Sequence, residues 1–291
     1  MEYLVLGANG YIGSYLYDRM KQDRVNVVGT GHRDHSVNDL IHFNILHDSI
    51  VDIVKLVEDE EKAAVICIAQ TNIDQCRAEY QLARDINVVQ TKKIIEVLAK
   101  ENFHIIFFST DNVFDGKRGN YTEQDKTNAL NCYGKMKEEL ENFVTVHYSD
   151  ACIFRLPKVL GSKRDSHNML TDLENKAFDG EVKCIKDSMM SIVSLEDVYQ
   201  ACIIATKRKL SGIYNLSSGE IYSRRELATL FFDHLGIKNK EIVEQNLEQF
   251  NFKEIRPLNI GLNNLKFRVE TGYEFENYQN ILNQYFDNIC Q

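Results

Sequence analysis

Two residues suited to acid–base chemistry, Tyr133 and Lys137, stand four positions apart in the chain. On a helix this spacing places both side chains on one face. A tyrosine hydroxyl, with an ordinary pKa of about 10, is by itself a poor acid or base at neutral pH. A neighbouring ammonium group favours the phenolate and makes the phenol usable for proton transfer. Thr110 follows an apolar run over 104–108, and its hydroxyl can donate a hydrogen bond to a substrate carbonyl oxygen.

A glycine-rich loop near the start of the chain has the features of a phosphate-binding turn. Gly7, Gly10 and Gly13 are spaced as G-x-x-G-x-x-G between an apolar run and a helical pattern. In such a loop the first glycine allows the tight turn, and the second lets a pyrophosphate approach the backbone. The third lets helix and strand pack closely, and the helix N-terminus offers free N–H groups to phosphates. The loop therefore predicts dinucleotide binding.

The residues after the second predicted strand bear on which dinucleotide binds. In NAD-binding sheets a carboxylate at this point accepts hydrogen bonds from the ribose hydroxyls. Here the strand expected over 25–28 is followed by Thr30, Gly31, His32 and Arg33, with no acid among them. Because the Arg33 guanidinium suits a 2′-phosphate, NADP(H) is favoured and NAD(H) is left open.

These candidate residues lie in a half-chain where strand-like and helix-like segments alternate. Strands are expected over 4–6, 25–28, 40–43, 64–68, 104–108 and 152–154, and helices over 12–20, 49–57, 78–99 and 133–144. Continuous apolar strands separated by helices indicate a parallel sheet that is covered on both faces. We therefore expect an α/β fold, a doubly wound parallel (Rossmann) sheet with a smaller, mainly C-terminal substrate-binding region.

After about residue 160 the alternation of strand-like and helix-like segments becomes less regular, although no flexible linker marks a domain boundary. We expect residues 1–161 to form the dinucleotide-binding domain, with 191–216 returning to it. The segments 162–190 and 217–291 are expected to form the substrate-binding region. Within the latter, Ser223 and the glutamate three residues later predict a capping box that opens a helix.

Composition excludes several classes of protein. With 291 residues, 44% hydrophobic and 26% charged, the chain is of ordinary globular type. A net charge of −9 makes nucleic acid and anionic membranes poor partners, and no apolar run is long enough to span a bilayer. The N-terminus lacks the features of a secretory leader. Seven cysteines without a Cys-x-x-Cys pair are typical of reduced thiols, so a cytoplasmic location is expected.

Three blocks of sequence resemble the extended short-chain dehydrogenase/reductases, and among them most closely the dTDP-4-dehydrorhamnose reductases. The blocks are Gly7–Gly13, Ser109–Gly116 and Asn120–Lys137. The resemblance is strong over residues 1–161 and thin beyond them. It implies NADP(H)-dependent reduction of a keto group on a nucleotide-activated deoxysugar, as in polysaccharide biosynthesis. The expected partners are a nucleotide-diphosphate sugar and, as one option, a second copy of the chain in a homodimer.

The resemblance also implies roles for individual residues. The catalytic residues would be Thr110, Tyr133 and Lys137, and no metal is expected. The cofactor would be held by Gly7, Asn9, Gly10, Tyr11, Ile12, Gly13, Arg33, Asn44, Ile45, Ala69, Tyr133 and Lys137. The substrate would be held by Asp111, Asn168 and Arg256, the last of which suits a diphosphate because of its bidentate fork.

Departures from the family pattern bear on the alternatives. Asn112 stands where related nucleotide-sugar dehydratases carry an acid–base carboxylate, so dehydration is disfavoured. A nucleotide-sugar epimerase is another reading, but His167 and Cys184 do not match by position the Cys/His pair of GDP-fucose-type epimerase-reductases. A third reading, from another class, is a non-catalytic dinucleotide-binding regulatory subunit, like the β subunit of methionine adenosyltransferase, which shares this fold.

Overall fold

The computed structural model describes residues 1–32, 39–165, 167–177 and 181–287, and the chain divides into two compact units. The first unit comprises Met1–Thr110, Cys132–Arg155 and Tyr199–Tyr214; the second comprises Asp111–Asn131, Leu156–Val198 and Asn215–Gln291.

These units are bounded differently from the predicted domains. Four segments that we expected in the dinucleotide-binding domain group instead with the C-terminal segments: 111–131, 156–161, 191–198 and 215–216. The reason lies in long-range backbone bonds, such as the one from Tyr121 N to Gly261 O at 2.8 Å. Local sequence patterns carry no signal for such pairings.

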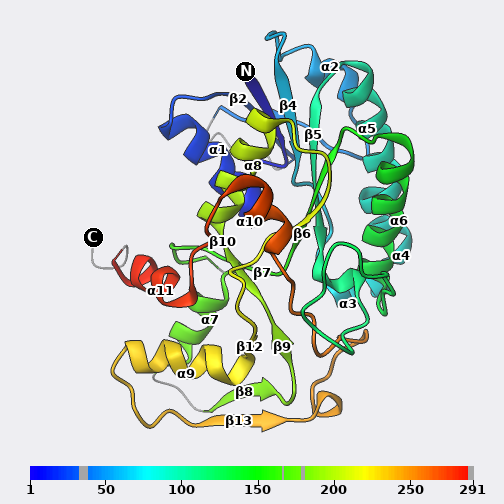
Figure 1. Cartoon of the computed structure of the whole chain (residues 1–291). Helices are drawn as coiled ribbons and strands as arrows, with labels where there is room; N and C mark the ends of the chain where they lie inside the picture. Colours follow the sequence, from blue (N-terminus) through cyan, green and yellow to red (C-terminus); the bar gives the residue numbers. More distant parts are fainter. Residues whose placement is uncertain (33–38, 166, 178–180, 288–291) are drawn as a thin grey trace. The chain divides into compact units, whose positions relative to one another are not determined.

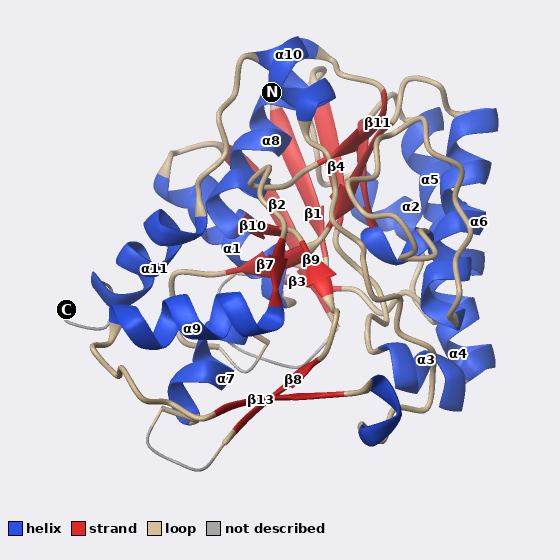
Figure 2. Cartoon of the chain, turned by 60° about the horizontal axis from the view of Figure 1, so that its bottom comes forward, coloured by secondary structure: helices blue, strands red, loops and turns tan. Residues whose placement is uncertain are grey.

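Seven strands in the described part of the first unit form one sheet, in the order β11-β6-β5-β4-β1-β2-β3 (Figures 1 and 2). They are β1 (Glu2–Leu6), β2 (Asn26–Gly31), β3 (Ile41–His42), β4 (Lys62–Ile66), β5 (His104–Thr110), β6 (Cys152–Leu156) and β11 (Gly212–Asn215). The pairs β1–β2, β1–β4, β2–β3 and β4–β5 are parallel. Read from β3, this is the doubly wound order, and it confirms the predicted fold class. Ligands of such sheets bind outside the carboxyl ends of the strands, where the order reverses between β1 and β4.

Helices cover both faces of this sheet (Figure 1). They are α1 (Tyr11–Gln22), α2 (Ile50–Val54), α3 (Ile73–Ala78), α4 (Tyr80–Arg84), α5 (Thr91–Lys100), α6 (Cys132–His147) and α8 (Leu195–Arg208). On one face the buried apolar side chains of α2, α5 and α6 pack with those of the strands in a single cluster. On the other face α1 and α8 lie together, with the Arg19 guanidinium 5.1 Å from the ring centroid of Tyr199.

The long helix expected over 78–99 is instead interrupted. A π-helical turn, Asp85–Gln90, separates α4 from α5. At this turn the Thr91 hydroxyl donates to Ile86 O at 2.8 Å, and the buried Asn87 side chain reaches a loop that follows β4. Single π turns in helices are frequent at functional sites. The prediction of one continuous helix was wrong because apolar periodicity does not register a single wider turn.

In the described part of the second unit, three small sheets pair β7 with β10, β9 with β12 and β8 with β13. The strands are β7 (Lys158–Leu160), β8 (Val182–Ile185), β9 (Met189–Met190), β10 (Ile192–Ser194), β12 (Tyr222–Ser223) and β13 (Ile242–Gln245). The helices are α7 (Met169–Asn175), α9 (Arg224–His234), α10 (Leu265–Thr271) and α11 (Tyr278–Asp287), with short 3₁₀ turns at Asp111–Val113 and Leu247–Gln249.

The capping box predicted at Ser223 is confirmed. Glu226 N donates to the Ser223 hydroxyl at 3.0 Å, and Ser223 N donates to the Glu226 carboxylate at 2.7 Å. These bonds satisfy two backbone N–H groups at the start of α9. The buried face of α9 then packs with α7 and α11 in an apolar cluster that includes Phe231 and Tyr285.

Candidate active site

The loop between β1 and α1 is held by backbone hydrogen bonds to the neighbouring strand. Ala8 N donates to Thr30 O at 2.7 Å, and Gly7 N donates to the Thr30 hydroxyl at 3.2 Å. Gly7 has a φ of +87°, a conformation that favours glycine. Thr30 is fully buried and supports the loop from β2, a role that the sequence did not indicate.

The second and third glycines of this loop meet different surroundings. A Cβ at Gly13 would lie 2.2 Å from Gly7 O, so only glycine permits this close approach of helix and strand. A Cβ at Gly10 would meet only that same carbonyl oxygen, at 3.4 Å, so the space beyond Gly10 is open. Gly10 is also the N-cap of α1 and brings no side chain to its first N–H groups. Open space before an uncapped helix N-terminus fits a pyrophosphate group.

The other predicted cofactor residues of this loop lie at the start of α1. The Asn9 side chain lies against β2, because a Cβ at Gly31 would be 3.0 Å from its Cγ. Tyr11 and Ile12 are half-buried in the first turn of the helix. Their contacts with a cofactor stay predictions.

Asn44 and Ile45 follow β3 in a tight turn. Asn44 Oδ1 accepts from Leu46 N at 3.0 Å, and Asn44 N donates to the Asp48 carboxylate at 2.6 Å. Ile45 is half-buried against the core of the first unit. Arg33, on which the NADP(H) preference depends, lies outside the described residues.

An amide that we did not place in the site holds the loop after β4. Asn87 accepts from Gln70 N and donates to Gln70 O, both at 2.8 Å, and is 1% exposed. This pair of bonds fixes the backbone next to Ala69, a predicted cofactor contact. The signal available in the sequence was an amide within an otherwise apolar helical pattern.

The predicted acid–base residues lie near the start of α6. Tyr133 and Lys137 are 8% and 4% exposed, on successive turns of the helix. The Lys137 ammonium donates to Phe108 O at 2.8 Å and lies 4.5 Å from the ring centroid of Phe107. Thr110 is buried at the end of the same strand, two residues beyond Phe108. The structure therefore ties Lys137 to the strand that ends in Thr110, at the carboxyl edge of the sheet.

Burial governs the charge of Lys137. It lowers the pKa of the ammonium to about 8, while the Glu141 carboxylate acts to raise it. The amine is still mostly protonated at pH 7 and can stabilise a phenolate one turn away. Because the lysine has an ordinary pKa of 10.5, burying its charge costs stability below pH 8. That cost falls as the pH rises from 8 towards 10.5. A buried cation held at such a cost is typical of a functional site.

Glu141 itself belongs to a buried ion pair. Arg155 of β6 donates from Nε to Oε1 at 3.0 Å and from a terminal nitrogen to Oε2 at 2.7 Å. The two side chains are 3% and 4% exposed, so each charge depends on the other. The pair fixes the carboxylate one turn beyond Lys137. Neither residue was a candidate from sequence, since they are fourteen positions apart on different elements.

The predicted substrate residues Asp111 and Asn168 lie in the second unit. Asp111 is buried and accepts from Asn112 Nδ2 at 2.9 Å. Asn168 is 1% exposed; its amide caps α7 by accepting from Leu170 N at 3.2 Å and donates to Gly161 O at 2.7 Å. Asn168 thus has a structural role in its loop, and a contact with substrate stays a prediction.

Arg256, the predicted diphosphate ligand, is engaged by its own loop. Its guanidinium lies 4.6 Å from the ring centroid of Phe252 and donates to Glu254 O at 3.2 Å. Both contacts are local, since Phe252 and Glu254 stand four and two positions before Arg256. They do not test whether Arg256 binds a diphosphate, and that role stays a prediction.

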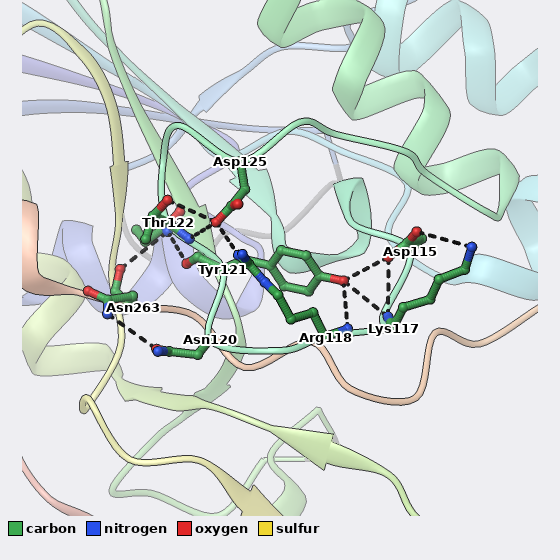
Figure 3. Close-up of polar contacts among 9 residues, drawn as sticks. Asp115, Lys117, Arg118, Asn120, Tyr121, Thr122, Asp125 and Asn263 are labelled. Atoms are coloured by element: carbon green, nitrogen blue, oxygen red, sulfur yellow. Dashed lines mark hydrogen bonds and ion pairs between the residues drawn. The ribbon is translucent and has the colours of Figure 1, made fainter.

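The segment that starts at Asp111 is tied down by Tyr121 (Figure 3). The Tyr121 hydroxyl donates to Asp115 Oδ1 at 2.7 Å and accepts from Lys117 N at 3.0 Å and Arg118 N at 3.2 Å. The hydrogen bond from Tyr121 lowers the pKa of the Asp115 carboxyl. This network fixes the backbone of residues 115–121, which follow Asp111 in the chain.

Other arrangements of reactive groups are less suited to catalysis. Cys184 is buried on β8, and burial raises the pKa of its thiol, whereas His167 is exposed beside Asp165 at 2.9 Å. In the part of the chain that the structure describes, no cluster of histidine, cysteine and acidic residues could hold a metal ion. Nor does that part contain a helix with the length and apolar character needed to cross a bilayer.

Comparisons with known proteins match this chain over most of its length. A family model described as RmlD substrate binding domain matches residues 1–290. Methionine adenosyltransferase 2 subunit beta from Xenopus laevis is 27% identical over 248 residues, covering 82% of this chain and 73% of that protein.

Two solved structures are similar over nearly the whole chain. A dTDP-4-dehydrorhamnose reductase from Clostridium acetobutylicum has a TM-score of 0.87 and 26% identity, with 100% of both chains covered. A dTDP-4-dehydrorhamnose reductase from Bacillus anthracis, in complex with NADP, has a TM-score of 0.86 and 20% identity, covering 99% of this chain and 100% of that one. The second likeness shows a shared fold.

Proposed function

Because the chain belongs to the RmlD substrate binding domain family, we propose that it reduces a keto group on a nucleotide-activated deoxysugar with NADP(H). The observation that carries this proposal is the buried pair of Tyr133 and Lys137 beside the end of β5. The likeness to the reductase from Clostridium acetobutylicum supports it. The glycine-rich loop after β1, at the carboxyl edge of the parallel sheet, supports the proposal that a dinucleotide binds in the first unit.

The proposed roles follow from the resemblance to the reductase family, and the burial of these side chains near the end of β5 and the start of α6 supports them. Tyr133 gives its proton to the carbonyl oxygen of the substrate, and the Lys137 ammonium stabilises the phenolate that remains. Thr110 donates a hydrogen bond that orients the carbonyl. The chemistry that a bound NADPH supplies is hydride transfer to the carbonyl carbon. Asp111, Asn168 and Arg256 are the proposed substrate contacts.

The test of this function is consumption of NADPH by the purified protein. We expect loss of NADPH absorbance with at least one member of a panel of 4-keto-6-deoxy sugars carried on different nucleoside diphosphates. NADPH should be used in preference to NADH if Arg33 holds the 2′-phosphate. A tightly retained NAD with interconversion of sugar epimers would support the epimerase reading instead.

A second function is favoured by one comparison. The relative from Xenopus laevis is named as a subunit of methionine adenosyltransferase, which supports a regulatory role for a dinucleotide-binding chain. Dinucleotide binding without turnover of any sugar in the panel, together with a change in the activity of an added methionine adenosyltransferase, would favour this reading.

Two glycine variants test where the cofactor phosphates bind. Gly10→Ala places a methyl group in open space before α1, so it should fold normally and lose about 1.5–3 kcal/mol of NADPH binding. Gly13→Ala forces a methyl group onto Gly7 O, so it should lower the free energy of unfolding by about 3 kcal/mol. Calorimetric titration and thermal unfolding measure the two effects. Unchanged NADPH affinity in Gly10→Ala would remove this loop from the cofactor site.

A further inference from the structure

A cavity that the proposed reaction does not use lies at the edge of the first unit where the strands of its sheet begin. Its volume is about 580 Å³, within the range of small-molecule sites. Lys62 and His104, the first residues of β4 and β5, line it, as do Ala151 and Ser211, which immediately precede β6 and β11. All of its lining residues belong to the first unit.

This cavity is distinct from the candidate active site. His104 is the first residue of the seven-residue strand β5, and Thr110 is the last. Because a strand rises about 3.3 Å per residue, roughly 20 Å separates the two ends. The cavity lies at the end of the sheet marked N in Figure 1, and the glycine loop follows the opposite end of β1. A ligand of this cavity therefore leaves the acid–base pair untouched.

His104 contributes an unsatisfied acceptor to the wall of the cavity. Its Nε2 lies 2.9 Å from Leu210 O, and a carbonyl oxygen only accepts, so Nε2 carries a proton. Burial lowers the pKa of the imidazole below its ordinary 6.5, so the ring is neutral at pH 7 and Nδ1 is an acceptor. Nδ1 is buried and has no hydrogen-bond partner in the described part of the chain. Since an unpaired buried acceptor is costly, a ligand N–H would stabilise this wall.

Charged groups of both signs line the same cavity. They include Asp150, in the turn after α6, and Lys209, directly after α8. The charge of Lys209 lowers the pKa of His104 and that of Asp150 raises it, so both charges act on this ring. Within the described ranges, neither side chain has a hydrogen bond or an ion pair. The cavity thus offers one anion and one cation that a ligand can pair.

The remainder of the wall is partly apolar. Lys62 is engaged there, since its ammonium lies 4.8 Å from the ring centroid of Phe103. Two further carboxylates, Glu60 and Glu61, are exposed in the turn before β4. The buried or half-buried apolar and aromatic side chains are Ala99, Phe103, Ile105 and Tyr148. Such a surface favours a ligand with an apolar part.

The backbone at Lys209 is unusual for a lysine. Its φ of +50° lies in the left-handed region, where glycine ordinarily ends a helix. Lys209 N donates to Thr206 O at 3.3 Å and Leu210 N to Ala205 O at 2.9 Å, which closes α8. Glycine would form this turn at lower cost, so the turn itself does not account for the lysine side chain.

We propose that this cavity binds a small zwitterion, an α-amino acid with an apolar side chain. Its ammonium group pairs with Asp150 and donates to His104 Nδ1, and its carboxylate pairs with Lys209. Its side chain covers the apolar part of the wall. Each group that lacks a partner thereby gains one of the appropriate kind. The inference is independent of the reaction proposed for the opposite edge of the sheet.

The test is calorimetric titration of the purified protein with phenylalanine, leucine and methionine. For each amino acid, the acid without the amino group and the amine without the carboxyl group are titrated in parallel. For phenylalanine these are 3-phenylpropionate and 2-phenylethylamine. We expect saturable binding of at least one amino acid, with dissociation constants about tenfold or more higher for its two analogues.

Two variants assign the charged groups of the ligand. Lys209→Gly should weaken amino-acid binding about tenfold or more and should not weaken binding of the amine, which has no carboxylate to pair. Asp150→Asn should weaken amino-acid binding similarly and should not weaken binding of the acid. Lys209→Gly should not lower the melting temperature, because glycine suits this backbone. Lys207→Gln, on α8 but outside the cavity, is the matched control and should stay within about twofold of the parent.

Several results would count against the site. The absence of saturable binding of all three amino acids by the parent would overturn the proposal, as would equal affinities in the parent, Lys209→Gly and Asp150→Asn. An analogue that binds as tightly as its amino acid would rule out recognition of a zwitterion. Amino-acid binding that NADPH abolishes would place the ligand at the opposite edge of the sheet. NADPH affinity should be the same in all four proteins.

Discussion

Replacing Tyr133 with phenylalanine is expected to lower kcat by about 10²–10⁴-fold, the usual contribution of general acid–base catalysis. The ring remains and fills the same buried volume in α6, so folding should be preserved. NADPH should still bind, because the glycine loop and the uncapped end of α1 are unchanged. Steady-state kinetics on the best sugar in the panel, with titration of NADPH, measure both quantities.

A matched tyrosine distinguishes loss of the acid from loss of any hydroxyl. The Tyr199 hydroxyl donates to the Asp23 carboxylate at 2.7 Å, between α8 and the end of α1. Tyr199→Phe should therefore lower stability by about 0.5–1.5 kcal/mol and leave kcat unchanged. Near-normal turnover in Tyr133→Phe would show that another group is the acid.

Arg155→Met is expected to lower the free energy of unfolding by about 3–5 kcal/mol. The reason is that Glu141 would remain buried without its partner, since the pair is only 3% and 4% exposed. The double variant Arg155→Met/Glu141→Leu should recover part of this loss, because it removes both charges of the pair; the buried Lys137 ammonium, which the Glu141 carboxylate favours, keeps the recovery incomplete. Chemical unfolding followed by circular dichroism measures all three proteins.

An exposed ion pair of the same unit serves as the control. Lys55 pairs with Asp52 at 3.2 Å, with the two side chains 66% and 74% exposed. Lys55→Met should cost less than about 1 kcal/mol, the usual contribution of a surface pair. A loss in Arg155→Met no larger than in Lys55→Met would mean that water reaches Glu141.

The parts of this protein that the sequence predicted correctly depend on local spacing. The doubly wound order follows from apolar strands alternating with helical patterns, and the capping box at Ser223 from residues three apart. The glycine loop has its expected turn, and Tyr133 and Lys137 lie on successive turns of one helix. In each case the physical cause is the fixed geometry of a helix, strand or turn, which a few neighbouring residues specify.

What the sequence left open was decided by contacts between distant segments. Asn87, in the π turn, bonds to Gln70 of the loop after β4, and Arg155 of β6 pairs with Glu141 of α6. Lys137 donates to Phe108 O because α6 packs against β5. Burial also lowers the pKa of the Lys137 ammonium, and burial is a property of the assembled chain rather than of any short stretch of it. For this reason the sequence by itself determined the fold class and nominated the acid–base pair, and the tertiary structure alone decided which charges are partnered.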